Sequence, residues 1–150
     1  MDLTSLNVKD NKNPDKKYLC EHTFAELTAV CPESKLPDFY TIKITYEPEE
    51  SLVELKSLKY YFSSFRNIEI LHEELINKIT DDLIKSIEPR RIYVELQVNV
   101  RGGINTVIKR KWSKTNGDED IFTSNPTWRD DKEWKWILNT KVATCHEWLL

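Results

Sequence analysis

Residues 71–98 read LHEELINKITDDLIKSIEPRRIYVELQV, and the hydrophobic period of this stretch changes once. In its first part, apolar side chains recur every three or four residues, which predicts an amphipathic helix that ends before Pro89. In its second part, apolar and polar residues alternate, which predicts a half-buried strand. The helical set is Leu71, Leu75, Ile76, Ile79, Leu83, Ile84 and Ile87; the strand set is Ile92, Val94, Leu96 and Val98.

The segments around this stretch predict the rest of the sheet. Residues 40–46 alternate cleanly between apolar and polar side chains, and residues 23–30 alternate with neither face cleanly polar. Residues 51–65 begin like a strand and turn into a short helix. A last strand over residues 104–112 would pair across the turn at residues 101–103. Two strands, helices and two further strands predict an α+β domain with an antiparallel sheet backed by helices.

The composition is that of an ordinary soluble globular domain. The chain has 150 residues, of which 39% are hydrophobic and 31% charged. This length suits one domain that can fold without a disulfide or a metal. The net charge of −3 is too small to indicate a nucleic acid, and no apolar run is long enough to span a membrane. We therefore expect no direct nucleic-acid or membrane partner.

The cysteines and glycines of the sequence indicate the cellular compartment of the protein and the way in which it could bind a cofactor. Three cysteines without a signal peptide indicate a reducing cytosol, so we expect a cytoplasmic protein. Three glycines, two of them adjacent as Gly102 and Gly103, exclude a glycine-rich phosphate loop. A cofactor would therefore have to be held by side chains.

The two ends of the chain differ from its middle. The first seventeen residues are polar and charged, and we expect a loose arm over residues 1–20. Residues 21–150 would then form a single domain. Its tail from Lys114 is polar and tryptophan-rich and has no clear period.

The loop CPESKLPD, residues 31–38, carries a cysteine and an aspartate between two predicted strands. A loop of this length can fold back and bring the Cys31 thiol close to the Asp38 carboxylate. Because a neighbouring carboxylate raises a thiol's pKa, Asp38 would act by taking the thiol proton and passing it on. Such a pair suits a nitrile, since sulfur attacks the carbon and the nitrogen needs a proton. The alternative is that Cys31 is a small buried residue.

Charged residues elsewhere have both a structural and a functional interpretation. Glu73, beside His72, could accept two parallel hydrogen bonds from a guanine-like edge, or simply lie in a solvated first helical turn. Lys56 and Lys59 with Glu54 could be a solvated face. Arg101 could be a turn residue or could bind phosphate.

Metal binding is a further possibility that the spacing disfavours. Cys20 and His22 lie near one end of the chain, and Cys145 and His146 lie near the other. Neither pair has a standard zinc spacing. We therefore expect no metal.

Four ordered motifs resemble the 7-cyano-7-deazaguanine reductases of the queuosine pathway, members of the tunnelling fold that also includes GTP cyclohydrolase I. Residues 54–61, ELKSLKYY, match the cofactor motif of that family at every position. The other motifs are Cys31-Pro32 with Pro37-Asp38-Phe39, the pair His72-Glu73, and the turn Arg101-Gly102-Gly103. The matches keep their order and intervals over roughly residues 23–112.

The resemblance implies a role for each matching residue. Cys31 would form a covalent thioimide with the nitrile carbon, and Asp38 would donate protons. The deazaguanine would be held by Val53, Glu54, Leu55, His72 and Glu73. NADPH phosphates would be held by Lys56, Lys59 and Arg101. The fold implies a ring of identical subunits with sites at their interfaces.

Two other functions remain open on the sequence. An amidinotransferase relative uses the same cysteine and aspartate on a nitrile already in tRNA, but lacks the cofactor motif. A catalytically silent tunnelling-fold protein could bind a purine or pterin, or use its aromatic tail for interaction. The complete motif over residues 54–61 favours the reductase, and the presence of both Cys31 and Asp38 argues against silence.

Overall fold

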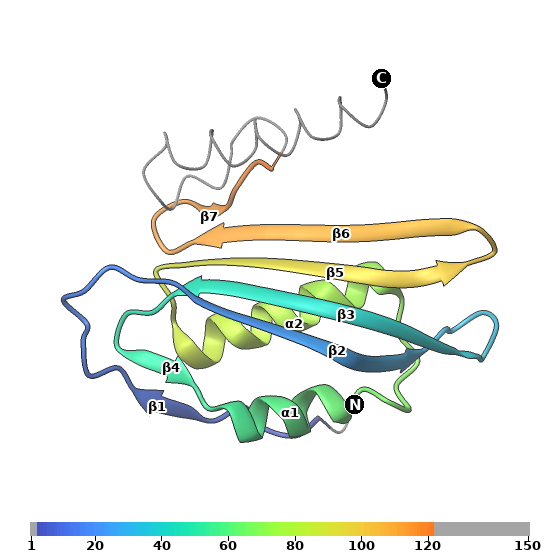
Figure 1. Cartoon of the computed structure of the whole chain (residues 1–150), viewed down its shortest axis with the longest axis horizontal. Helices are drawn as coiled ribbons and strands as arrows, with labels where there is room; N and C mark the ends of the chain where they lie inside the picture. The colour runs from blue at the N-terminus through green and yellow to red at the C-terminus, as the bar shows by residue number, and fades with distance from the viewer. Residues whose placement is uncertain (1–2, 122–150) are drawn as a thin grey trace.

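The computed structural model describes residues 3–121 of the chain, and these residues form two helices and seven strands, which are arranged in a five-stranded main sheet and a two-stranded sheet of β1 and β4 (Figure 1). The elements are β1 (Val8–Asp10), β2 (Cys20–Val30), β3 (Pro37–Glu47), β4 (Ser51–Val53), α1 (Leu55–Ser63), α2 (His72–Ile87), β5 (Arg91–Arg101), β6 (Ile104–Ser113) and β7 (Gly117–Asp118). The main sheet is antiparallel, with five strands in the order β2-β3-β5-β6-β7. The predicted α+β class and antiparallel sheet are confirmed.

The core lies between one face of the sheet and the two helices. Alternate residues of β3 point into it: Tyr40, Ile42, Ile44 and Tyr46 are almost fully buried. They stand opposite Val98, Leu96, Val94 and Ile92 of β5, so the two alternating patterns face the same side. Both strands therefore follow the period that the sequence predicted.

The helices cover this face with most of the apolar residues that the sequence predicted; Leu71, predicted on the apolar side of the second helix, is instead its exposed N-cap. The helix α2 buries Leu75, Ile76, Ile79, Leu83 and Ile87. It ends at Ile87, and the C-cap Glu88 has a left-handed backbone (φ 44°) that directs the chain into Pro89. The helix α1 buries Leu58, Tyr61 and Phe62 and contacts β2 through the stacked rings of Phe62 and Phe24.

The strand β2 contains an irregularity that explains its mixed sequence pattern. Its register with β3 shifts between Phe24 and Leu27. A bulge places an extra residue in one strand and interrupts the alternation of faces. For this reason neither face of residues 23–30 reads as cleanly polar in the sequence.

The N-terminal segment is not the loose arm that was expected over residues 1–20, because part of it is paired and buried. Residues 8–10 form β1, which pairs with β4, and Asn11 is buried. The backbone amide of Asn7 donates to the Ser57 hydroxyl oxygen at 2.9 Å, and the Asn11 side-chain amide donates to the carbonyl of Glu49 at 2.7 Å. A polar segment is held here by backbone pairing and polar contacts, which a composition argument does not detect.

Neither a membrane-spanning helix nor the whole of the C-terminal tail is found among residues 3–121. Among the described residues, no helix is long and apolar enough to cross a bilayer. The tail predicted from Lys114 is described as far as Ile121 and includes the short strand β7. Its tryptophan-rich part and the pair Cys145-His146 lie outside the described residues.

Candidate functional site

Four chain segments meet at one end of the main sheet: the end of β2, the start of β3, the start of α2 and the end of β5 (Figure 1). They bring together six chemically active side chains, which we call the Cys31 cluster: Cys31, Asp38, Tyr40, His72, Glu73 and Arg101. Five of these residues were predicted as site residues from the sequence. Antiparallel pairing brings Cys31 and Asp38 to the same end of the sheet, because β2 ends where β3 begins.

Cys31 lies at the first position after β2, in a tight loop. The loop is closed by two backbone hydrogen bonds: the Cys31 amide donates to the Leu36 carbonyl and the Lys35 amide to the Cys31 carbonyl, each at 2.9 Å. Lys35 has a left-handed backbone (φ 62°), and its ammonium pairs with Glu69 at 2.9 Å. The loop therefore holds the half-buried Cys31 thiol in one place.

The surroundings of Cys31 lower the pKa of its thiol. A hydrogen bond from the Ser34 side chain is the largest cause, followed by the amides of Ser34 and Glu33. The Ser34 amide lies 3.5 Å from Sγ. The charge of Asp38 acts in the opposite direction, as the sequence argument expected, but it is outweighed. Hydrogen bonds to the charged form therefore favour a nucleophilic thiolate.

Asp38 is the second residue of β3 and is only 2% exposed. Its Oδ1 forms an ion pair with Nη1 of Arg101, and its Oδ2 lies 3.9 Å from Nδ1 of His72. Burial of a carboxylate is costly unless charged or polar partners surround it. The cluster supplies such partners.

Tyr40 belongs to the cluster although sequence reasoning assigned it only to the core. Its hydroxyl lies 2.8 Å from Nδ1 of His72. Burial, and then the charge of Asp38, raise the pKa of Tyr40 above its ordinary value, so the phenol keeps its proton. The available signal was the strand period: residues 38 and 40 share one face of β3.

Glu73 lies exposed in the first turn of α2, beside His72. Its charge raises the pKa of Tyr40, which places it within electrostatic reach of the cluster. Within residues 3–121 its carboxylate has no hydrogen-bond or ion-pair partner, whereas Glu74 Oε2 accepts from the Leu71 amide at 3.4 Å. Glu73 is therefore available to a ligand, and Glu74 serves the helix.

The residues expected to bind the base beside Cys31 include three that lie at the opposite end of the sheet. The Val53 amide donates to the Tyr46 hydroxyl at 3.1 Å, and Leu55 is exposed. Tyr46 is eight residues along β3 from Asp38, a span of roughly 26 Å at about 3.3 Å per residue. Within one chain, these residues do not join the Cys31 cluster.

Glu54 has a structural partner that the sequence did not indicate. Its carboxylate caps α1 by accepting from the amides of Ser57 at 2.7 Å and Lys56 at 2.9 Å. The Ser57 amide, and then that of Lys56, lower the pKa of Glu54. Glu54, which the resemblance implies as a ligand of the base, is therefore also the N-cap of α1.

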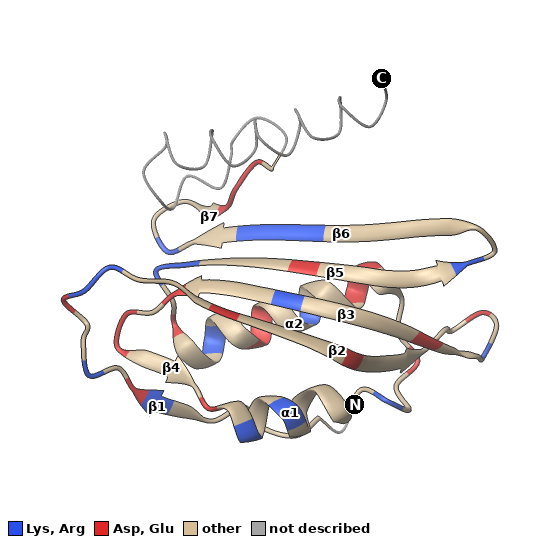
Figure 2. Cartoon of the chain, viewed as in Figure 1, with Lys and Arg blue, Asp and Glu red and all other residues tan. Residues whose placement is uncertain are grey.

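Lys56 and Lys59 are exposed on α1, three residues apart (Figure 2). In the described part of the chain, neither ammonium group has an ion-pair partner. Side chains three apart in a helix lie on one side, so the two cations can face a common anion. Unpaired lysines with this spacing fit the phosphates of a dinucleotide.

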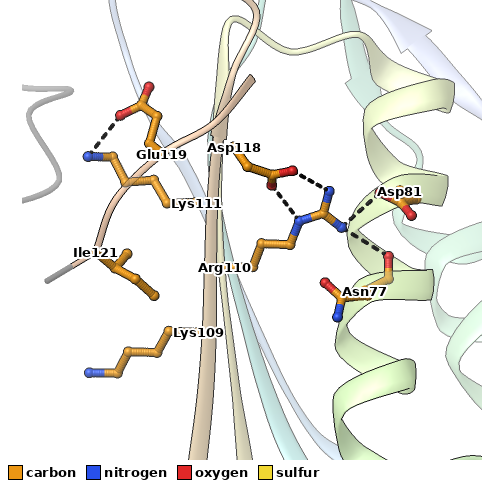
Figure 3. A pocket seen from close by; sticks show the side chains of 8 residues that line it. All are labelled: Asn77, Asp81, Lys109, Arg110, Lys111, Asp118, Glu119 and Ile121. Atoms are coloured by element: carbon orange, nitrogen blue, oxygen red, sulfur yellow. Dashed lines mark hydrogen bonds and ion pairs between the residues drawn. The ribbon is translucent and has the colours of Figure 1, made fainter. Parts of the chain in front are cut away.

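A surface pocket of about 440 Å³ lies between α2 and the edge formed by β6 and β7 (Figure 3). Arg110 dominates it and pairs with Asp81 of α2 at 2.7 Å and Asp118 of β7 at 2.8 Å. Buried Lys111 pairs with Glu119 at 3.0 Å. Arg110 and Lys111 thus have their ion-pair partners within the protein. We interpret the pocket as structural, since Arg110 links α2 to β7.

Metal binding has no support from the described residues. Cys20 and His22 lie on β2 near Tyr46, and burial raises the pKa of Cys20. Among residues 3–121, no three histidine, cysteine or acidic side chains come together as metal ligands.

Comparisons with known proteins agree on one family. A model of the family described as QueF-like protein matches residues 37–117. The NADPH-dependent 7-cyano-7-deazaguanine reductase of Chlorobaculum tepidum is 45% identical over 115 residues, which are 77% of this chain and 98% of that protein. The protein of the same name from Thermomicrobium roseum is 47% identical over 105 residues, 70% of this chain and 82% of that protein.

A solved structure supports the fold. The apo form of the archaeosine synthase QueF-Like superposes with a TM-score of 0.59 and 24% sequence identity. The match covers 62% of this chain and 91% of that one. At this identity the likeness concerns the arrangement of the strands and helices.

Proposed function

Because this chain belongs to the QueF-like protein family, we propose that the Cys31 cluster is the active site of a nitrile reductase. The reaction is the NADPH-dependent reduction of 7-cyano-7-deazaguanine to the aminomethyl base, in queuosine biosynthesis; the names of the curated relatives support it. The observation that carries the proposal is the meeting of a partly exposed Cys31 thiol, with lowered pKa, and the buried Asp38.

The first step is addition of Cys31 to the nitrile. The sulfur forms a bond to the nitrile carbon, one π bond of the nitrile breaks, and the thiol proton ends on nitrogen. Asp38 passes that proton between the two atoms. The product is a thioimide that contains every atom of the thiol and the nitrile.

Reduction to the amine then needs four electrons and protons for nitrogen. When bound, NADPH would supply these electrons as two successive hydrides. The bond between the Cys31 sulfur and carbon breaks between the two reductions, and the sulfur regains a proton, which restores the thiol. Asp38 delivers the protons, and His72 returns them from solvent, since its side chain is 30% exposed beside the buried Asp38. Tyr40 keeps its own proton and fixes the His72 ring through their 2.8 Å contact.

The deazaguanine is held at the start of α2. Glu73 accepts two parallel hydrogen bonds from the N1–H and the exocyclic amine, since its carboxylate has no partner among residues 3–121. His72 lies beside it. Val53, Glu54 and Leu55 complete the pocket from a second copy of the chain. In their own chain they lie near Tyr46, which is roughly 26 Å along β3 from Asp38. The proposed assembly is therefore a ring with sites shared between neighbours, as in the tunnelling fold.

Glu73→Gln is expected to weaken binding of the nitrile base by roughly 2–4 kcal/mol, or about 30- to 1,000-fold in Kd. The new amide presents a donor to the donors of the base and leaves polar groups unpaired. The measurement is calorimetric titration of the base into a Cys31→Ala background, which prevents covalent capture.

Glu74→Gln is the matched control, because glutamine keeps an oxygen that can accept from the Leu71 amide. It is expected to change Kd little. Equal losses at positions 73 and 74 would mean that the start of α2 has a structural role only.

Lys59→Ala is expected to raise the KM for NADPH roughly tenfold, because one charge-assisted contact to phosphate is lost. NADH, which lacks the extra phosphate, should be a poor substitute with the unaltered protein. Added salt should weaken the preference for NADPH by screening exposed lysines. The measurement is nitrile-dependent NADPH oxidation at varied cofactor concentration.

Lys85→Ala removes an exposed lysine from the last turn of α2 and serves as the control. Its KM for NADPH is expected to match the unaltered protein. If Lys59→Ala matched it as well, α1 would not be the phosphate site.

A further inference from the structure

Arg101 reaches Asp38 because of an irregularity in β5. Asp38, Tyr40 and Val98 share the helix-facing side of the sheet, and regular alternation would turn residue 101 to the other side. Instead, Val98 pairs with Thr106 and Arg101 pairs with Ile104, so three steps along β5 match two along β6. Such bulges re-aim a side chain. Here the re-aimed side chain is the arginine that pairs with the aspartate.

The ion pair divides the two oxygens of Asp38 between different neighbours. Oδ1 is taken by Nη1 of Arg101, while Oδ2 lies on the side of His72, 3.9 Å from Nδ1. This charge-assisted contact from the guanidinium holds Oδ1 in place. The Asp38 side chain is only 3% exposed and the Arg101 side chain is 43% exposed. A half-exposed arginine thus orients a buried carboxylate.

We propose that Arg101 is the positioning residue for Asp38 in thioimide formation: it holds Oδ1 so that Oδ2 can transfer the thiol proton to the nitrile nitrogen. The bonds formed and broken are those of the addition step, and Arg101 gains and loses no atoms. This inference rests on the proposed function. Arg101 is also expected to contact a phosphate of the cofactor. The positioning role is additional to that contact and acts before any cofactor binds.

The test is the rate of adduct formation without cofactor. The protein is mixed with 7-cyano-7-deazaguanine alone, and the mass increase is followed over time at several base concentrations. Arg101→Gln is expected to lower the limiting rate constant roughly 10- to 100-fold, since small errors in the placing of reacting groups are costly, with little change in the concentration of half-saturation. Arg101→Lys should recover part of the rate by restoring a cation.

Arg91→Gln is the matched control, because Arg91 pairs at 3.0 Å with the buried Glu47, also between β5 and β3 but at the far end of the sheet. Arg91→Gln should leave the rate of adduct formation unchanged. The comparison therefore separates the positioning of Asp38 from a general effect of losing a buried ion pair. An unchanged limiting rate in both Arg101 variants, with a raised KM for NADPH, would overturn the proposal and leave a phosphate ligand only.

The remaining outcomes are also decisive. If Arg101→Gln does not fold, the limiting rate of Arg101→Lys decides, and a rate equal to that of the unaltered protein overturns the proposal. Equal slowing in Arg91→Gln also overturns it. Failure of the unaltered protein to form any adduct would instead remove the proposed function, and the positioning role with it.

Discussion

Cys31→Ala is expected to abolish covalent capture of the nitrile base and, with it, turnover. With the base present and no cofactor, the mass of the unaltered protein should rise by the mass of the base, because addition to a nitrile retains every atom. The variant lacks the sulfur that forms the new bond, so its mass should stay constant. Intact-protein mass spectrometry measures the difference directly.

The other two cysteines are the controls for this experiment. Cys20 begins β2, eleven residues before Cys31, and burial raises the pKa of its thiol, which disfavours a thiolate. Cys20→Ala and Cys145→Ala should both still form the adduct. An adduct that persists in Cys31→Ala would show that another nucleophile is used.

Asp38→Asn is expected to slow both adduct formation and turnover by roughly 10²–10⁴-fold, the usual contribution of a proton-transfer group. Asparagine keeps the shape of the side chain and an oxygen that can accept from Arg101. It cannot take up and release the thiol proton, so the nitrile nitrogen is left without its donor. Pre-steady-state mass measurements and NADPH oxidation report the two rates.

A matched substitution separates this effect from a simple loss of charge. Asp81 is an exposed aspartate of α2 that pairs with Arg110, and Asp81→Asn should leave both rates close to those of the unaltered protein. If the turnover of Asp38→Asn were within a few-fold of that of the unaltered protein, Asp38 would have no catalytic role and would only begin a strand.

The regular elements could be predicted because burial on one side imposes a period on the sequence. The helix α2 and the strands β3 and β5 each have one covered face, and their apolar residues follow it. The short strands β1 and β7 have no such signal: their residues are mostly exposed, and backbone pairing alone holds them. Pairing between distant segments leaves no local pattern, so the docking of residues 8–10 on β4 was missed.

The site could be predicted as a set of residues but not as an arrangement. Cys31 and Asp38 were expected to meet, and the loop closure between Cys31 and Leu36 brings them to the same end of the sheet. The contact between Asp38 and Arg101 depends on a bulge, which alternation cannot anticipate. The lowered pKa of Cys31 depends on hydrogen bonds from the Ser34 side chain and from the Ser34 and Glu33 amides, which the folded loop brings to the sulfur. Glu54 was expected to bind the base, and its capping of α1 follows from its position directly before the helix.

Mixing the protein with 7-cyano-7-deazaguanine and NADPH, and following the absorbance of the reduced cofactor, tests the central claim most directly. NADPH should be oxidised only when the base is present, and two equivalents should be consumed for each base converted, because a nitrile needs four electrons to become an amine. Formation of the Cys31 adduct without oxidation of NADPH or NADH would contradict the reductase. An ammonia-dependent product on a nitrile-bearing tRNA would then identify the amidinotransferase in its place.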